Sequence, residues 1–331
     1  MSYKKLDTTL FSAWNSYAVS MMSVLEDCGM WNKEDTFQKF LGVTGIAAQI
    51  RIDKNCSALP VTDYDWRENV LFMERIGVTT KVCFAALDDT DYTSKQEAAI
   101  SEVKEAIDND KAVTVWGIGT GEFGIIDGYD EEDEVFFVKG IGSNNSNSNL
   151  PILFKNLGKT FEHAPILYCE IPDGHKAIDW KQSYIDSLQI YLEEMQKISE
   201  TPDVSYGISA YDRLVSALEQ NHVDDFGLRY CIGIYYERKE AMFLYLKEIR
   251  EVFSNSSIFD RIIETFHKIS KLYYNVMFEI LKQGTCGWND LRKPIDKKSY
   301  PDIILSIKNI KSNEIDGIEL IKRFLEEYKT N

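Results

Sequence analysis

Histidine is scarce in this sequence, and cysteine never occurs in the closely spaced pairs that bind zinc. The four histidines are His163, His175, His222 and His267. The six cysteines are Cys28, Cys56, Cys83, Cys169, Cys231 and Cys286. They form no Cys-x-x-Cys pair and have no histidine at metal-ligand spacing, so neither a zinc site nor a disulfide framework is indicated. We therefore expect buried free thiols, and neither a metal nor a cofactor.

Positive charge and long apolar runs are lacking as well. The sequence has 53 acidic and 37 basic residues, a formal net charge of −16. This charge opposes binding to phosphate backbones, because that binding depends on Lys and Arg. No stretch approaches the roughly 20 apolar residues of a membrane span, and residues 1–7 lack the pattern of a secretory signal. We expect a cytoplasmic protein whose partners include neither nucleic acid nor a membrane.

The first half of the chain combines helical and strand patterns. Apolar side chains recur at helical spacing in residues 12–30, 63–76 and 94–108, and Ser94 with Glu97 has the spacing of a capping box. Short runs rich in Val, Ile, Phe and Tyr occupy residues 112–117, 123–129, 135–139 and 165–171. Such runs, separated by turn residues, favour an antiparallel sheet. The pattern predicts an α+β domain with helices leading and strands following.

The second half has the pattern of a helical bundle. Predicted helices cover residues 180–199, 207–220, 224–253, 257–283 and 301–329. Apolar residues surround most of the segment 226–249, as expected of a helix at the centre of a bundle. Pro172-Asp173-Gly174 separates the two patterns, and 331 residues with 44% apolar side chains suffice for two cores. We therefore predict two domains, residues 1–172 and 173–331.

Ser16 is the first candidate for chemistry. It lies where the first predicted helix begins, directly after Trp14 and Asn15. A helix N-terminus offers unpaired N–H groups and a partial positive charge, which stabilise a nucleophile or an oxyanion. A serine hydroxyl loses its proton far less readily than a thiol, so it needs a general base in contact. The alternative is a structural hydroxyl that caps the helix or is simply buried.

Glu122 is the second candidate. It follows Gly119-Thr120-Gly121 and begins a predicted strand. A carboxylate beside a helix N-terminus is stabilised in its ionised form, and it can serve as a base for a hydroxyl or as an anchor for a cationic ligand group. The alternative is an exposed loop glutamate. Residues 119–124 also match the glycine spacing of a dinucleotide fingerprint, but a strand follows where that fingerprint requires a helix.

Four neighbouring residues complete the candidate site. Asn15 is a candidate oxyanion donor. Trp14, Trp116 and Tyr129 are aromatic residues that the predicted fold would gather near a cleft between helix and sheet. Aromatic lining with few polar groups is typical of a site for a small ligand, although it also describes an ordinary core.

Three stretches, Trp14–Leu25, Leu41–Ala48 and Glu122–Asp130, together resemble the butirosin-biosynthesis H protein N-terminal family. The resemblance covers about residues 8–171, and residues 206–211 and 229–246 resemble the helical extension often attached to that family. It implies a papain-like fold related to the bacteriocin-leader, C39-like peptidases. For the founding member it implies an acyltransferase that moves an aminoacyl group from a carrier protein to an aminoglycoside amine.

Carried over residue by residue, the resemblance places the family's cysteine position at Ser16 and its histidine position at Glu122. The third catalytic position falls near Val138 or Lys139, neither of which can orient a histidine. All three positions depart from the pattern of a Cys–His hydrolase. The sequence thus predicts a papain-like cysteine-peptidase-type α+β domain, a leading helix plus an antiparallel sheet, followed by an all-α helical bundle.

Three functions remain open from the sequence. The first is a pseudoenzyme that binds a small molecule or a peptide in a degenerate cleft, as an accessory to natural-product or peptide metabolism. The second is an acyltransferase or amide hydrolase with Ser16 as nucleophile and Glu122 as base. The third is a non-catalytic interaction module in which the helical half docks on a partner. The expected partners are a small molecule, a peptide or a carrier protein.

Overall fold

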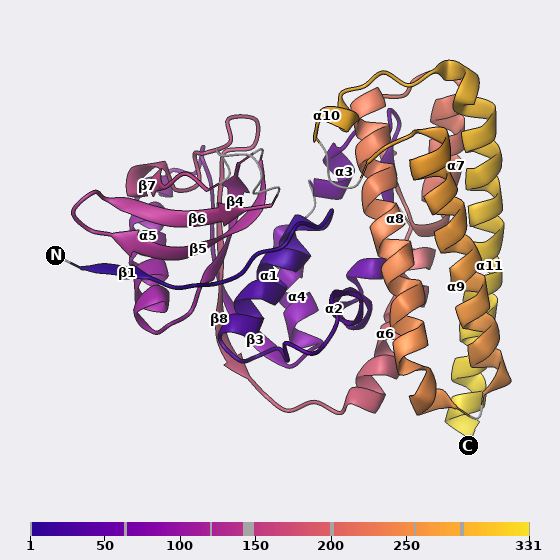
Figure 1. Ribbon diagram of the computed structural model, residues 1–331, viewed down its shortest axis with the longest axis horizontal. Coiled ribbons are helices and arrows are strands. Elements are labelled where there is room, and N and C mark those ends of the chain that lie inside the picture. Colours follow the sequence, from indigo (N-terminus) through magenta and orange to yellow (C-terminus); the bar gives the residue numbers. More distant parts are fainter. Residues whose placement is uncertain are drawn as a thin grey trace. The chain divides into compact units, whose positions relative to one another are not determined.

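The computed structural model describes residues 2–62, 65–119, 121–141, 149–198, 202–254, 256–284 and 288–330, so Cys286 lies outside the described residues. The chain is α+β, with an antiparallel sheet and a C-terminal helical region (Figure 1). It divides into two compact units. The sheet unit comprises residues 1–36 and 67–177, and the helical unit comprises residues 37–66 and 178–331.

The sheet of the first unit has the strand order β3-β8-β4-β5-β6-β7 among the described residues, with β1 paired to β5, and all pairs are antiparallel. The strands are β1 (Tyr3–Lys5), β3 (Val78–Ala86), β4 (Val113–Ile118), β5 (Glu122–Asp130), β6 (Val135–Gly140), β7 (Ile152–Leu153) and β8 (Ile166–His175). Strands β4, β5, β6 and β8 confirm the four predicted runs. The edge strand β3 was not predicted, because its buried and exposed residues do not alternate regularly.

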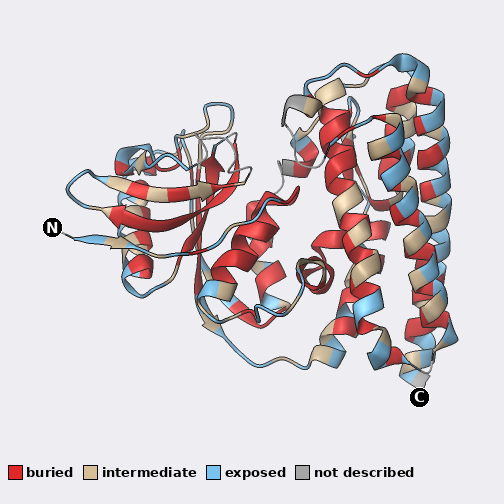
Figure 2. Ribbon diagram, in the orientation of Figure 1, coloured by how far each residue is buried: buried red, intermediate tan, exposed pale blue. Residues whose placement is uncertain are grey.

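Helices cover both faces of this sheet. On one face, α1 (Ser16–Asp27) packs its Val24 against Ile125 of β5, and α4 (Asn69–Glu74) joins it there through Phe72, whose ring lies 6.4 Å from that of Tyr17. On the other face lies α5 (Tyr92–Asp108), whose buried side chains share a core with those of β4, β5, β6 and β8. The first ten residues of α1 are all buried (Figure 2). Helix α1 is therefore enclosed on every side, as expected of a central helix.

Two predicted helix starts differ from the structure. Helix α5 begins at Tyr92 with Asp91 as its N-cap, so the capping box predicted at Ser94 is wrong. Ser94 lies inside the first turn, where its hydroxyl donates to the Asp91 carbonyl at 2.9 Å. The helix predicted for residues 63–76 is a 3₁₀ turn, η2 (Trp66–Glu68), followed by the short α4, and residues 63 and 64 lie outside the described residues.

The helical unit contains long helices and a two-stranded sheet. Its helices are α2 (Phe37–Thr44), α3 (Leu59–Thr62), α6 (Trp180–Gln196), α7 (Gly207–Glu219), α8 (Asp225–Glu248), α9 (Ser257–Tyr274), α10 (Trp288–Leu291) and α11 (Tyr300–Thr330). The shorter elements are η1 (Ile46–Ala48), η4 (Ile249–Phe253), the π-helical η5 (Asn275–Ile280) and η6 (Lys297–Ser299). Strand β2 (Arg51–Asp53) pairs antiparallel with β9 (Val204–Tyr206). No helix in the described part of the chain is both long and apolar enough to cross a membrane.

Residues 37–66 cluster with the helices, although the boundary predicted at residue 172 places them in the first domain. The contacts responsible are distant in sequence. Gly42 of α2 lies so close to the ring of Tyr245 that a Cβ atom there would be 2.2 Å from it. The Tyr235 hydroxyl donates to the Arg51 carbonyl at 2.5 Å and accepts from the Arg51 N–H at 2.9 Å. Local sequence patterns cannot predict contacts between residues this far apart in the chain.

Candidate active site at the start of helix α1

The structure brings Ser16 and Glu122 together. Ser16 is the first residue of α1, and Glu122 is the first residue of β5. The Ser16 hydroxyl donates a hydrogen bond to Glu122 Oε2 at 2.6 Å and accepts one from the Phe123 N–H at 3.3 Å. The two side chains are 7% and 3% exposed. The two candidate residues are therefore in direct contact.

A glycine-rich turn delivers Glu122 to this position. Gly117, Gly119 and Gly121 all have positive φ angles, a conformation that side chains with a Cβ rarely adopt. At Gly121 a Cβ would also lie 2.5 Å from the ring of Phe161. The glycines thus permit a tight connection from β4 to β5 beneath the loop that carries Phe161. Their spacing serves a hairpin, which accounts for the match to a phosphate-binding pattern without a phosphate site.

A cluster of aromatic rings packs around Phe123, the residue that follows Glu122. The buried Trp116 ring meets the ring of Phe123 edge to face at 5.1 Å and that of Phe161 at 6.0 Å. Phe123 in turn meets the ring of Tyr17, which follows Ser16 on α1, at 5.3 Å. Edge-to-face pairs of this kind fix ring orientation. Trp116 thus contacts Phe123, whose N–H donates to Ser16, and the sequence analysis missed Phe123 and Phe161.

Trp14 and Asn15 directly precede Ser16 in the chain. Both are buried, and Asn15 is the N-cap residue of α1. Its side chain makes no capping hydrogen bond, while its carbonyl accepts the first helical bond from Val19 N–H at 3.1 Å. The N–H groups of the first turn are therefore not capped by Asn15, which keeps the partial positive charge of the helix start close to Glu122.

Tyr129 does not belong to this site. Its hydroxyl is hydrogen-bonded to Asp108 Oδ1 and Ser2 Oγ, both at 2.8 Å, and its ring lies in the core beneath α5. The reason is an extra residue in β5: Ile126 pairs with Val138, but Gly128 pairs with Phe137, so Asp127 is bulged. A bulge reverses the alternation of side chains, so Tyr129 shares the face of Ile126 and not that of Phe123. The prediction of Tyr129 as a lining residue is corrected accordingly.

The third position of the family pattern has no equivalent here. Val138 is buried in the core beneath α5. Lys139 Nζ forms an ion pair with Asp127 Oδ2 at 2.7 Å and donates to the Thr8 carbonyl at 2.6 Å. Burial raises the pKa of Asp127, and Lys139 partly offsets that effect. This pair secures the N-terminal segment to the sheet, and neither residue orients Glu122.

The histidines offer no imidazole to Ser16. The partners of its hydroxyl in the described structure are Glu122 and the Phe123 N–H. His163 is exposed, and its ring lies 5.5 Å from that of Phe161, which places it on the loop above Gly121. His175 is exposed at the end of β8. Ser16 is therefore paired with a carboxylate and not with an imidazole.

A second buried carboxyl group lies on the same face of the sheet. Glu170 of β8 is fully buried and accepts hydrogen bonds from three hydroxyl groups. These are Thr80 at 2.8 Å, Tyr17 at 3.0 Å and Tyr168 at 2.5 Å. Burial raises the pKa of Glu170, and the three hydrogen bonds partly offset that rise. The sequence analysis missed this group, although a glutamate within the apolar strand of residues 166–171 is a usable signal.

Tyr17 links the two carboxyl groups. It donates its hydroxyl to Glu170, its ring packs on Phe123, and it follows Ser16 in the first turn of α1. Asn69 of α4 extends the network by donating to the Tyr168 hydroxyl at 3.1 Å. The first two residues of α1 are therefore each fixed by a buried carboxyl group, Ser16 by Glu122 and Tyr17 by Glu170.

Among the described residues, no group of three or more His, Cys, Asp or Glu side chains is arranged to hold a metal ion. Cys56, Cys169 and Cys231 are buried, and burial raises the pKa of each thiol, that of Cys56 to about 12. A scan of the chain against protein-family models finds no match, and a search of curated proteins finds none either.

Proposed function

We propose that the sheet unit is a degenerate papain-like domain that binds a small molecule or a peptide at the Ser16–Glu122 pair, as an accessory to natural-product or peptide metabolism. The observation that carries the proposal is the 2.6 Å hydrogen bond between these residues at the start of a buried helix. This is where the resembled family places its nucleophile and base. The location of the catalytic pair is retained while the thiol and the imidazole are replaced.

The chemistry of the site favours a ligand with a cationic group. Glu122 supplies a carboxylate, and the next residue, Phe123, carries a ring that contacts Trp116, which in turn contacts Phe161. Carboxylates and aromatic faces both attract ammonium groups, more strongly where water is excluded. A primary amine on a small molecule, or the amine of a peptide, fits this combination.

Two features favour binding over catalysis. Carboxylates as a class are weaker bases than imidazole, so Glu122 gains little by taking the proton of a serine hydroxyl. The Ser16 oxygen also already accepts a hydrogen bond from Phe123 N–H. A hydroxyl used in this way helps to position a carboxylate more readily than it attacks a carbonyl carbon.

A thermal-shift screen tests the proposal. The panel consists of polyamines, aminoglycosides and lysine-containing peptides, with matched acetylated compounds that lack the positive charge. We expect at least one amine to raise the melting temperature of the wild-type chain, and Glu122→Gln to abolish that shift. The matched control is Glu132→Gln, which removes the same charge from an exposed turn residue at the far end of β5. Native mass spectrometry of each hit then gives the stoichiometry.

Loss of the shift in Glu122→Gln with retention in Glu132→Gln would support the site. A shift that survives in Glu122→Gln would place the ligand elsewhere in the molecule. A shift that acetylated compounds produce equally well would contradict the preference for a cationic group.

A second candidate function is acyl transfer or amide cleavage by Ser16, and the same 2.6 Å hydrogen bond favours it, because nucleophile and base must lie within hydrogen-bond reach. In this reaction Ser16 Oγ forms a bond to the acyl carbon while its proton passes to Glu122. The bond from the acyl carbon to the leaving thiol or amine breaks as that group takes the proton from Glu122. An acceptor amine or water then attacks the acyl carbon, its proton passes through Glu122 to Ser16 Oγ, and the bond between the acyl carbon and Ser16 breaks.

Labelling with a fluorophosphonate or an acyl thioester distinguishes the two functions. Catalysis predicts one adduct, located at Ser16 by peptide mass mapping, that disappears in Ser16→Ala and Glu122→Gln. Ser94→Ala, a change on an exposed turn of α5, is the control. Absence of an adduct, combined with a ligand that depends on Glu122, leaves binding as the function.

A further inference from the structure

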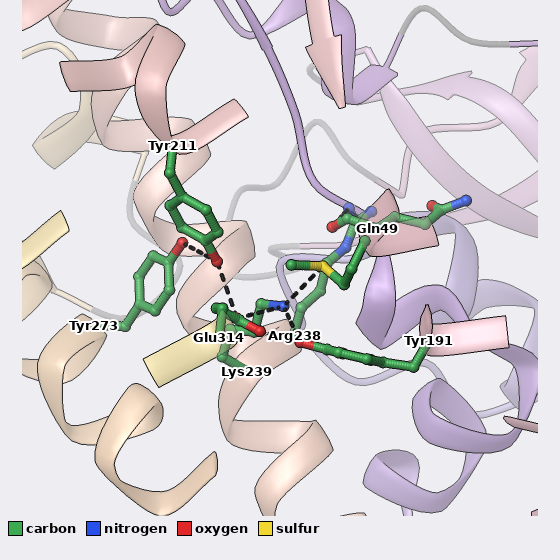
Figure 3. Close-up of polar contacts among 8 residues, drawn as sticks. Gln49, Tyr191, Tyr211, Arg238, Lys239, Tyr273 and Glu314 are labelled. Atoms are coloured by element: carbon green, nitrogen blue, oxygen red, sulfur yellow. Dashed lines mark hydrogen bonds and ion pairs between the residues drawn. The ribbon is translucent and has the colours of Figure 1, made fainter. Parts of the chain in front are cut away.

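A closed polar network lies at the centre of the helical unit (Figure 3). Five helices each contribute one side chain to it, and every one is at most 1% exposed. The residues are Tyr191 of α6, Tyr211 of α7, Lys239 of α8, Tyr273 of α9 and Glu314 of α11. Lys239 and Glu314 are both fully buried charges, which is rare unless they are paired.

The contacts of the ion pair leave no site open for a ligand. Lys239 Nζ lies 2.8 Å from Glu314 Oε1, 3.1 Å from the Tyr191 hydroxyl and 3.9 Å from Met195 Sδ, which occupies its three N–H groups. Tyr191 donates to Glu314 Oε2, and Tyr211 donates to Oε1 at 3.0 Å. Both carboxylate oxygens are thus occupied, and the network is complete without a partner.

Such a network contributes little net stability. Taking two charges out of water costs about as much as their mutual attraction returns, so a well-packed apolar replacement is often equally stable. Burial lowers the pKa of Lys239, and the charge of Glu314 offsets part of that effect. Breaking the pair from one side is different, because it leaves a buried charge without a partner.

Helix α11 shows what the pair contributes instead. Its buried residues include Tyr300, Ser306, Leu320, Phe324, Leu325 and five isoleucines, and Glu314 is the one charged residue among those described. The isoleucines, Ile303, Ile307, Ile310, Ile318 and Ile321, form with Glu314 a row whose members lie three or four residues apart. A slide of one or two turns would bring one isoleucine of this row to the place of another. A slide of one turn, about 5.4 Å, would place an isoleucine near Lys239. The 2.8 Å contact cannot survive that movement.

We propose that the Lys239–Glu314 network selects the register of α11 in the helical unit and is not a source of its stability. The network distinguishes one arrangement of otherwise similar isoleucines. In an arrangement shifted by four or seven residues, Lys239 faces an isoleucine and loses its counter-charge. The three tyrosines also fix the positions of α6, α7 and α9 along the bundle axis. Each hydroxyl must lie beside its acceptor, and a shift of its helix would separate the two.

Two variants of the full chain separate selection from stability. Glu314→Leu leaves Lys239 unpaired, and we expect a large fall in the urea midpoint of the helical transition. The second variant replaces the whole network at once: Lys239→Met, Glu314→Leu, Tyr191→Phe, Tyr211→Phe and Tyr273→Phe. We expect its urea midpoint to equal or exceed that of the wild type, because no buried polar group is left without a partner.

Methyl NMR of isoleucine-labelled protein then reports the register. The wild type should give one resonance for each isoleucine of the α11 row, and the five-residue variant should give several, because more than one register is populated. Glu314→Gln retains a hydrogen-bonding partner for Lys239 and should keep single resonances at a lower midpoint.

A five-residue variant with single resonances in unchanged positions would overturn the proposal, because something else would then fix the register. A five-residue variant that unfolds at lower urea than the wild type, or fails to fold, would overturn it as well. That result would show the network to be a source of stability. Glu314→Leu with a wild-type midpoint would likewise contradict it.

Discussion

Glu170 of the sheet unit and Glu314 of the helical unit are both fully buried, but different donors satisfy them. Glu170 accepts hydrogen bonds from three neutral hydroxyls on α1, β3 and β8. Glu314 accepts from two tyrosines and also pairs with the ammonium group of Lys239. Neutral donors reduce the cost of burying a charge without cancelling it, whereas a counter-charge makes each partner depend on the other.

This difference assigns different roles to the two carboxyl groups. Burial raises the pKa of Glu170, so its protonation state responds to pH and acts on Tyr17 beside Ser16. Glu314 is bound to Lys239 and to two tyrosines on other helices of the bundle, so its role is to fix geometry. The sheet unit should therefore be sensitive to pH through Glu170, and the helical unit should be sensitive to any loss of pairing.

The largest effect is expected for Lys239→Met. The substitution leaves Glu314 buried without its counter-charge, and breaking a buried ion pair from one side costs about 3–5 kcal/mol. Urea denaturation followed by circular dichroism at 222 nm measures the free energy of unfolding. The control is Lys308→Met, which removes an exposed pair with Glu219 and should cost about 0–1 kcal/mol. Equal effects for the two variants would contradict the special status of the buried pair.

A smaller effect is expected for Thr80→Val. The variant keeps the shape of the side chain but removes one hydroxyl donor from Glu170, and an unsatisfied buried acceptor costs about 1–3 kcal/mol. Thr79→Val on the same strand is exposed and serves as the control. The same urea titration, followed by tryptophan fluorescence, gives both values. If Thr80→Val is as stable as Thr79→Val, the Thr80 hydroxyl does not stabilise the Glu170 carboxylate.

The smallest effect concerns pH. Because the pKa of Glu170 is raised in the folded state, the folded protein holds this proton more tightly than the unfolded chain does. The resulting stability is fully present below the ordinary glutamate pKa of about 4.3. It is lost as the pH rises through the raised value, with a slope of at most about 1.4 kcal/mol per pH unit. Glu170→Gln should lack this pH dependence, so the stability curves of the wild type and the variant should diverge with this slope. Parallel curves across this range would show that Glu170 does not titrate there.

The resemblance predicted that Ser16 and Glu122 share one site, and local patterns predicted that each of these residues begins an element. The apolar spacing of residues 12–30 places a helix start near Ser16, and the glycines before Glu122 place a strand start there. Local signals of this kind can be read from the sequence, because the ends of helices and strands depend on nearby residues.

Other features depend on geometry that local patterns do not encode. The bulge at Asp127 moves Tyr129 to the opposite face of the sheet; Gly128 beside it is compatible with a bulge, but a glycine does not specify which residue is inserted. The pairing of residues 37–66 with α8 is distant in sequence. The buried carboxyl groups left a clearer trace, because Glu170 and Glu314 each interrupt an apolar pattern. A charged residue in such a position indicates a buried partner, but the sequence does not identify that partner.

Charge-selective labelling at position 16 tests the Ser16–Glu122 site most directly. Ser16→Cys is treated with a cationic and with an anionic methanethiosulfonate of similar size, and modification of the new thiol is followed by peptide mass spectrometry. We predict faster reaction with the cationic reagent, a preference lost when Glu122→Gln is added and kept when Glu132→Gln is added. Equal rates for the two reagents, or a preference unchanged by Glu122→Gln, would contradict a site in which Glu122 receives a cationic ligand beside Ser16.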